Sequence, residues 1–324
     1  MADLTALTPS TALPSMTEAQ VSIARLRETI ATVYLGNTSA IDQLLVCLLA
    51  RGHCLIEDVP GVGKTVLATA LAKGINCSFS RIQLTPDLLP SDILGVSIYR
   101  RELDHFEFKR GPIFANVVLA DEINRATPRA QSALLEAMSD AAVTVDGITH
   151  RLEPPFMLVA TQNPSEFEGT YTLPENQLDR FLMRVSLGYP TAEVESSVIV
   201  SRPAKNALPQ LAPALDVSDV LALQTRTDNV RLDPAIVKYI VALATATRNH
   251  ESLALGVSPR GSLALSLAAR ATAVLAGRDY AVPDDVVKNV VPVWAHRIIS
   301  TTGNDARRNA PVLLGILSTV PSPV

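Results

Sequence analysis

The stretch HCLIEDVPGVGKTVLATALA, residues 53–72, decides the fold of this chain. Its first residues are apolar and typical of a buried strand, and its last residues carry leucine and alanine at helical spacing. Between them, Gly61 and Gly63 precede Lys64 and Thr65, which open the helix. A strand, a glycine-bearing loop and a helix that starts with Lys-Thr form a phosphate-binding loop. The stretch therefore predicts an α/β protein that binds a nucleotide at the start of this helix.

Each position of the loop has a physical task. Glycines let backbone N–H groups curl round an anion, and the helix start adds its partial positive charge. We expect Lys64 to reach the β- and γ-phosphates of ATP, and the Thr65 hydroxyl to ligate Mg²⁺. The residues predicted to bind the nucleotide here are Val59, Pro60, Gly61, Val62, Gly63, Lys64, Thr65 and Val66.

Asp58 departs from the strict form of this motif. The pattern GxxxxGK[ST] has glycine where this chain has Asp58. Aspartate tolerates a left-handed backbone better than most residues, so the turn remains feasible.

A second acidic segment complements the loop. Residues 117–120, VVLA, predict a buried strand that ends in Asp121 and Glu122. Ligands of open α/β sheets bind at the carboxyl ends of the strands. We expect Asp121 to hold the Mg²⁺ and Glu122 to orient or deprotonate the attacking water. Both segments together predict hydrolysis of ATP, because a phosphate loop without a metal carboxylate would hydrolyse it poorly.

Short apolar strands alternate with helices between residues 51 and 188, which predicts a parallel sheet with crossover helices. Thr17 and Gln20 form a predicted capping box for an earlier helix that runs to about Tyr34. The expected strands are 53–57, 79–84, 117–121, 156–161 and 183–187, and the expected helices of this region are 64–73, 128–139 and 175–181.

Two insertions interrupt the alternation. Residues 96–111 predict two short strands around a polar turn. Residues 142–152 carry Asp146-Gly147 between alternating residues, a strong hairpin signal. Such hairpins either contact another molecule or simply extend an edge of the sheet.

The chain changes character after Pro190. A proline- and alanine-rich connector follows, and then helices are predicted at 217–225, 234–249, 259–276 and 283–300. The expected fold is a P-loop NTPase core with a five-stranded parallel sheet and two inserted hairpins, followed by a small all-helical lid domain. The predicted boundaries are a flexible tail at 1–16, the α/β domain at 17–203, a linker at 204–216 and the lid at 217–324.

Composition narrows the function classes. The 324 residues carry a net charge of −4 and only 4% aromatic residues, which argues against a broad basic face for nucleic acid. No apolar run reaches the ~18 residues of a membrane span, and the N-terminus lacks the pattern of a secretory signal. The three cysteines lack CxxC spacing and the histidines lack metal-ligand spacing, so we expect a cytoplasmic protein with reduced thiols.

Four blocks of sequence, in order, resemble the AAA+ ATPases and, within them, the MoxR family. The resemblance covers about residues 33–299, and the family pattern also tolerates aspartate at the start of the phosphate loop. The blocks are EDVPGVGKT (57–65), ADEINRATPRAQSALLEAM (120–138), VATQNPSEFEGTYTLPENQLDRFL (159–182) and GVSPRGSLAL (256–265).

The resemblance implies further roles. Asn163 matches a polar sensor that helps to position the attacking water, and Arg180 matches an arginine finger presented to the nucleotide of the adjacent subunit. Arg260 matches a second sensor that reaches from the lid to the γ-phosphate. The loops around Gly36 and the lid would hold the adenine. The two hairpins look like insertions that face a ring pore or a client.

The resemblance also implies an assembly. We expect a homo-oligomeric ring, a hexamer, whose hydrolysis of ATP moves a protein client, with a von Willebrand factor A-domain protein as a partner. Three alternatives stay open on the same core: a nucleic-acid-directed motor or clamp loader, a metal-chelatase motor subunit, and a nucleotide-gated binding platform. The low aromatic content disfavours a nucleic-acid track.

Overall fold

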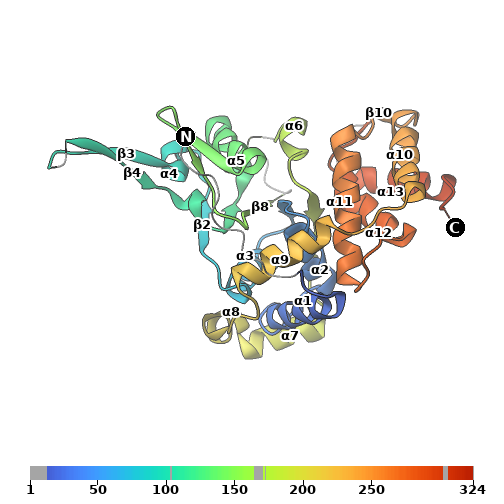
Figure 1. Ribbon diagram of the computed structural model, residues 1–324, viewed down its shortest axis with the longest axis horizontal. Coiled ribbons are helices and arrows are strands. Elements are labelled where there is room, and N and C mark those ends of the chain that lie inside the picture. Colours follow the sequence, from blue (N-terminus) through green and yellow to red (C-terminus); the bar gives the residue numbers. More distant parts are fainter. Residues whose placement is uncertain (1–12, 103, 164–170, 172, 302–305, 324) are drawn as a thin grey trace.

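The computed structural model describes residues 13–102, 104–163, 171, 173–301 and 306–323 (Figure 1). Most of the predicted tail, one residue of the first hairpin and residues 164–170 and 172 of the third sequence block lie outside the described residues. The helices are α1 (Met16–Ala31), α2 (Thr38–Leu49), α3 (Lys64–Gly74), α4 (Pro90–Leu94), α5 (Pro128–Asp140), α6 (Glu175–Leu178), α7 (Ala192–Ser201), α8 (Pro203–Asn206), α9 (Val217–Asp228), α10 (Pro234–Arg248), α11 (Pro259–Leu275), α12 (Pro283–Trp294) and α13 (Ala306–Thr319). The strands are β1 (Cys54–Glu57), β2 (Phe79–Gln83), β3 (Gly95–Arg100), β4 (His105–Arg110), β5 (Val117–Asp121), β6 (Ala142–Val145), β7 (Ile148–Arg151), β8 (Met157–Gln162), β9 (Met183–Val185), β10 (Leu253–Leu255) and β11 (Ile299–Ser300).

The central sheet has five parallel strands in the order β2-β5-β8-β1-β9, which confirms the expected core. Cys54 of β1 lies opposite Val159 of β8 on one side and Met183 of β9 on the other. All five strands end at the same edge of the sheet. The phosphate loop follows β1, Asp121 ends β5 and Asn163 follows β8, so these three neighbouring strands bring them to that edge.

Alternation along the buried strands supplies two hydrophobic cores, one on each face of the sheet. In β5, Leu119 joins the core beneath α1, α2 and α3, whereas Val118 and Ala120 join the core beneath α5. Continuous apolar runs such as VVLA are needed because both faces of each central strand are covered. The first core continues into the C-terminal helices, since α11 packs against α2 and α12 against β9.

The helix starts follow their capping residues. Thr127 caps α5 and is followed by Pro128 at the first helical position. The position predicted for the capping box of α1 is wrong, because the box lies two residues earlier in the chain. Ser15 is the N-cap, and its backbone N–H donates to the Glu18 carboxylate at 2.8 Å. Ser15 and Glu18 have the same spacing as Thr17 and Gln20, but Glu18 also brings a negative charge to the first turn.

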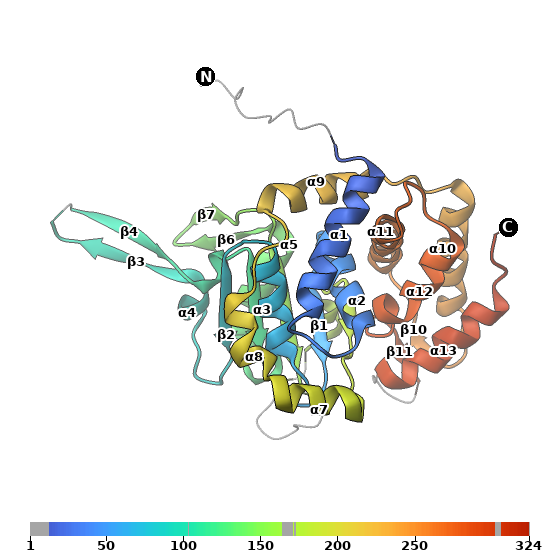
Figure 2. The same cartoon turned by 90° about the horizontal axis from the view of Figure 1, so that it is seen from below.

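Both predicted hairpins are present, as β3–β4 and β6–β7. Asp146 and Gly147 have φ angles of 51° and 77°, as a tight two-residue turn requires. Figures 1 and 2 show β3–β4 extending away from the sheet on the side opposite to the C-terminal helices.

The C-terminal region is helical, as expected, with one short addition. Its α12 ends at Trp294, before the predicted residue 300, because the chain then turns so that β11 pairs antiparallel with β10. The helices α4, α7, α8 and α13 were not predicted from the sequence, and of these α7 and α8 lie where a connector was expected. Among the described residues, no helix combines the length and apolarity needed to cross a bilayer.

Candidate active site

The phosphate loop joins β1 to α3 with the backbone that its glycines predict. Gly61 and Gly63 have φ angles of 85° and 96°, a region that L side chains rarely adopt. A Cβ added to Gly61 would have no described atom within 4 Å, so the loop faces open space there. Lys64 begins α3, and its Nζ donates to the Asp58 carbonyl oxygen at 2.6 Å. Backbone N–H groups, a helix start and an ammonium group therefore surround a space that suits a phosphate chain.

Asp58, in the position of the missing glycine, ties the loop to the segment after β9. Its carboxylate accepts hydrogen bonds from the N–H groups of Val59, Leu187 and Gly188 and from the Ser186 hydroxyl, at 2.7 to 2.9 Å. Burial raises the pKa of Asp58, but these hydrogen bonds outweigh burial, and the pKa lies below its ordinary value. Asp58 is not among the described residues with left-handed φ. The turn therefore does not depend on the tolerance of aspartate for a left-handed backbone. Instead, the hydrogen bonds of the Asp58 side chain hold the turn.

Asp121 ends β5 with both carboxylate oxygens bound. Oδ1 accepts from the Thr161 hydroxyl at 2.6 Å, and Oδ2 lies 2.6 Å from Arg81 Nη2 of β2. The Thr65 hydroxyl and the Asp121 carboxylate are hard oxygen donors, which fit Mg²⁺ when nucleotide phosphates supply further ligands. Within the described residues, no group of three or more His, Cys, Asp or Glu side chains could hold a metal alone.

Glu122 has an unusual backbone for a non-glycine residue, with φ 61° and ψ 53°. Its N–H donates to the Thr161 hydroxyl at 2.9 Å, so Thr161 holds both acidic residues in place. Its carboxylate accepts from Gln83 at 3.1 Å and lies 3.3 Å from Arg125 Nε. Backbone strain of this kind clusters at functional sites, where the surrounding structure maintains it.

Asn163 follows β8 and is 6% exposed. Because β8 lies between β1 and β5, Asn163 comes between the phosphate loop and Asp121. This is the place where a polar side chain could contact a water that attacks the γ-phosphate.

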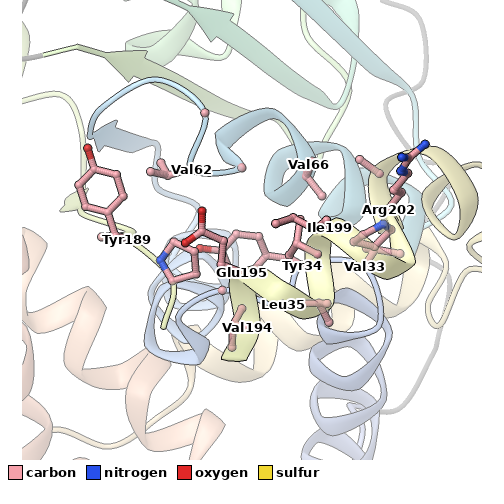
Figure 3. A pocket seen from close by; sticks show the side chains of 18 of the residues that line it. Val33, Tyr34, Leu35, Val62, Val66, Tyr189, Val194, Glu195, Ile199 and Arg202 are labelled. Atoms are coloured by element: carbon pink, nitrogen blue, oxygen red, sulfur yellow. The ribbon is translucent and has the colours of Figure 1, made fainter. Parts of the chain in front are cut away.

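A pocket of about 600 Å³ opens beside the loop. Figure 3 shows the Tyr34 ring and the Glu195 carboxylate between α7 and the phosphate loop. A Cβ at Gly36 would come within 2.5 Å of the Tyr34 ring, so this glycine permits the close approach of the ring. Burial raises the pKa of Tyr34 to about 12. Of the residues predicted to bind the nucleotide, six line this pocket: Gly36, Pro60, Gly61, Val62, Gly63 and Val66. The other three, Val59, Lys64 and Thr65, belong to the same loop and helix start.

The far wall of this pocket is α7, whereas we expected the lid there. Val194, Val198 and Ile199 of α7 line it, and they offer an apolar surface suited to a nucleobase. In the described chain, the residues that line this pocket all precede α9.

Arg180 and Arg260 lie elsewhere, in a second pocket between the α/β domain and α11. The Arg180 guanidinium donates to the Leu135 carbonyl at 2.7 Å and to the Ser139 hydroxyl, both in α5. Arg260 Nη1 lies 3.9 Å from Asp179 Oδ2, and its side chain is 60% exposed. The structure thus brings Arg260 together with Arg180 and not with the phosphate loop of the same chain; its role as a sensor stays a prediction.

Comparison with known proteins shows to which class this chain belongs. Residues 53–183 match the ATPase family associated with various cellular activities (AAA), and residues 245–312 match the AAA lid domain. The crystal structure of a protein from Cytophaga hutchinsonii superposes with a TM-score of 0.86, is 36% identical, and the match covers 95% of this chain and 97% of that one. The fold and the site thus define an AAA ATPase.

The family within this class follows from the relatives. The chain is 42% identical to Chaperone MoxR1 of Mycobacterium tuberculosis, over 90% of this chain and 80% of that protein. It is 32% identical to Protein MoxR of Paracoccus denitrificans, over 90% and 93% respectively. YeaC of Bacillus subtilis is 52% identical over 80% of this chain and 81% of its own length. This chain belongs to the MoxR family of AAA ATPases.

Several residues that build the site were not predicted from the sequence. Arg81 and Thr161 both contact Asp121, which lies 40 positions away from each, and Tyr34 lies beside Gly63 of the phosphate loop. A local pattern carries no sign of such contacts. The wall formed by α7 did leave a signal, because Thr191 is followed by Glu193 and Glu195, a usual start of a helix.

Proposed function

We propose that this chain is a Mg²⁺-dependent ATPase that works as a homo-oligomeric ring, a hexamer, in the cytoplasm. In this proposal each copy completes the active site of its neighbour, and hydrolysis remodels or matures protein clients.

The observation that carries the proposal is the separation of the two halves of the site. The phosphate loop opens into one pocket, whereas Arg180 lies in another, and in the described chain the two pockets have no lining residue in common. An arginine finger so placed can serve a nucleotide only when a second copy brings its own pocket to it. Membership of the AAA ATPases supports hydrolysis in general.

The residues then take the following parts. Lys64 and the loop N–H groups bind the β- and γ-phosphates. Glu122 accepts a proton from the attacking water, and Asn163 orients that water. Mg²⁺, held by Thr65 and Asp121, would neutralise charge on the phosphate oxygens. Arg180 of the neighbouring copy stabilises the charge on the transferred phosphoryl group, with Arg260 beside it.

Hairpin β3–β4 supports a protein as the client. Tyr99 and Phe106 face each other across it, with 49% and 69% of their surfaces exposed, and exposed aromatic side chains are typical of protein contacts. The basic residues on the hairpin are partly neutralised, since Arg100 pairs with Glu107 at 2.6 Å. This pairing disfavours a track for nucleic acid. A relative bears the name chaperone, which also fits a protein client. As a partner we propose a von Willebrand factor A-domain protein.

The decisive experiment measures ATPase activity per subunit against protein concentration, for the wild type and for Arg180→Ala. We expect the specific activity of the wild type to rise as copies assemble, and added Arg180→Ala chains to lower it. An activity that is independent of concentration, with no effect of the added chains, would contradict a shared site.

The alternative functions make different predictions for the same preparation. Equal phosphate release by wild type and Glu122→Gln would indicate a nucleotide-gated platform. Strong stimulation by DNA in a stoichiometric complex would indicate a nucleic-acid motor, and neither result is expected here.

A further inference from the structure

Arg297, three residues after α12, is a buried charged side chain that the proposed reaction does not use. Its side chain is 3% exposed, and its Nε donates to Asp179 Oδ1 at 2.7 Å. Nη2 donates to the carbonyl oxygens of Asp179, at 3.0 Å, and Phe181, at 2.6 Å. Nη1 donates to the carbonyl oxygen of Leu182 at 3.0 Å and to that of Val293. Four of these five acceptors therefore lie in the short segment 179–182.

This segment contains Arg180, and the acceptors lie on both sides of it. The backbone around Arg180 is thus held from the C-terminal region by Arg297. The Arg180 side chain is held from the other direction by α5, through Leu135 and Ser139. Figure 1 shows α6, which leads into this segment, between α5 and the C-terminal helices.

Asp179 connects the same segment to a second arginine. One of its oxygens binds Arg297 and the other lies 3.9 Å from Arg260 of α11. The C-terminal region therefore places two guanidinium groups beside one carboxylate, next to Arg180. A shift of these helices relative to the sheet would have to move this segment or break several charge-assisted hydrogen bonds.

We propose that Arg297 is a positioning residue, which holds the segment 179–182 so that Arg180 reaches the ATP of the neighbouring copy. Through Arg297, movement of the C-terminal helices is transmitted to that finger. The inference rests on the proposed role of Arg180. The planar fork of arginine is essential here, because the ammonium group of a lysine cannot bind a carboxylate and four carbonyls in these directions.

The test uses Arg297→Lys, which keeps the charge, with Arg278→Lys as a matched control. Arg278 also belongs to the C-terminal helical region and binds Asp285 with two hydrogen bonds of 2.7 Å, but among the described residues it has no hydrogen bond or ion pair with Arg180 or its neighbours. We expect Arg297→Lys to lower kcat by about tenfold or more, because small misplacements of a catalytic group are costly. Its affinity for a non-hydrolysable ATP analogue should stay within about threefold of the wild type, because its own phosphate loop is intact. Arg278→Lys should retain both values.

Mixing of chains then shows whether Arg297 acts on the neighbour. Glu122→Gln lacks its own hydrolytic site but carries an intact finger, so it should restore activity when mixed with Arg297→Lys. A second mixture, of Glu122→Gln with Arg180→Ala, tests the arginine finger itself. Sedimentation and thermal unfolding of each variant report assembly and folding.

The outcomes separate the two proposals. Recovery in both mixtures supports the positioning role. If activity recovers in the mixture with Arg180→Ala but not in the mixture with Arg297→Lys, the positioning role of Arg297 is overturned and the proposed function stands. The same conclusion follows if Arg297→Lys fails to assemble. No recovery with Arg180→Ala overturns the shared active site, and the inference about Arg297 with it.

Discussion

At the scale of single residues, the most informative side chain is Asp58. It replaces a glycine of the strict motif, and its carboxylate accepts four hydrogen bonds, three of which join the phosphate loop to the segment after β9. The lowered pKa of Asp58 reflects these bonds, because each of them favours the ionised carboxylate over the neutral acid.

We therefore expect Asp58→Asn to destabilise the protein by about 1–3 kcal/mol at neutral pH, because the amide turns a donor toward backbone N–H groups. The pKa of Asp58 is lower in the folded protein than in the unfolded chain, where it is about 3.9. Its stabilising contribution is thus complete above about pH 4 and is lost as the pH falls through the folded-state pKa. Urea unfolding of both proteins across this range should show a difference that shrinks in acid.

The control for this substitution is Asp140→Asn, at an exposed position at the end of α5. It should change the free energy of unfolding by less than about 0.5 kcal/mol, as surface substitutions usually do. A difference between wild type and Asp58→Asn that stays constant down to pH 3 would contradict the assigned hydrogen bonds.

At the scale of elements, α7 stands apart from the other helices that contact the site. None of its described residues is buried. Even the apolar side chains of Val198, Ile199 and Val200 are 40%, 66% and 84% exposed. A ten-residue helix in water is marginal without tertiary contacts. A nucleobase in the adjoining pocket would supply such contacts.

We expect the amide hydrogens of α7 to exchange quickly in the free protein and to be slowed by an ATP analogue with Mg²⁺. Hydrogen exchange measured by mass spectrometry checks this directly. Peptides from α10, which lies among the C-terminal helices, should exchange at the same rate with and without the nucleotide. Unchanged exchange in α7 at saturating nucleotide would remove it from the binding site.

At the scale of the whole molecule, the sheet and the C-terminal helices share one hydrophobic core. Leu44 of α2, Leu265 of α11 and Trp294 of α12 belong to the same cluster of buried residues. Trp294 is the only tryptophan of the chain, is fully buried, and donates to the Gly261 carbonyl at 2.8 Å. Its fluorescence therefore reports on the packing around α12.

A shared core predicts that both regions unfold together. The urea midpoint measured by Trp294 fluorescence should coincide with that measured by far-ultraviolet circular dichroism, which reports on all helices and strands. Two separate transitions would show that the C-terminal helices are an independent unit, and would weaken their coupling to Arg180.

The sequence by itself determined the local structure and the functional groups of residues that are close together along the chain. Gly61 and Gly63 require left-handed backbone, Lys64 and Thr65 open a helix, and apolar runs ending in Asp121 predict strands buried on both faces. Local sterics and periodicity decide such features, so the phosphate loop, the parallel sheet and both hairpins could be predicted.

Only the tertiary structure decided which distant side chains meet. The contact of Arg81 with Asp121, the wall that α7 builds, and the grip of Arg297 on the segment around Arg180 join residues tens to more than a hundred positions apart. The physical reason is that hydrogen bonds and ion pairs depend on distance and direction in space, and these are set only when the layers have packed together.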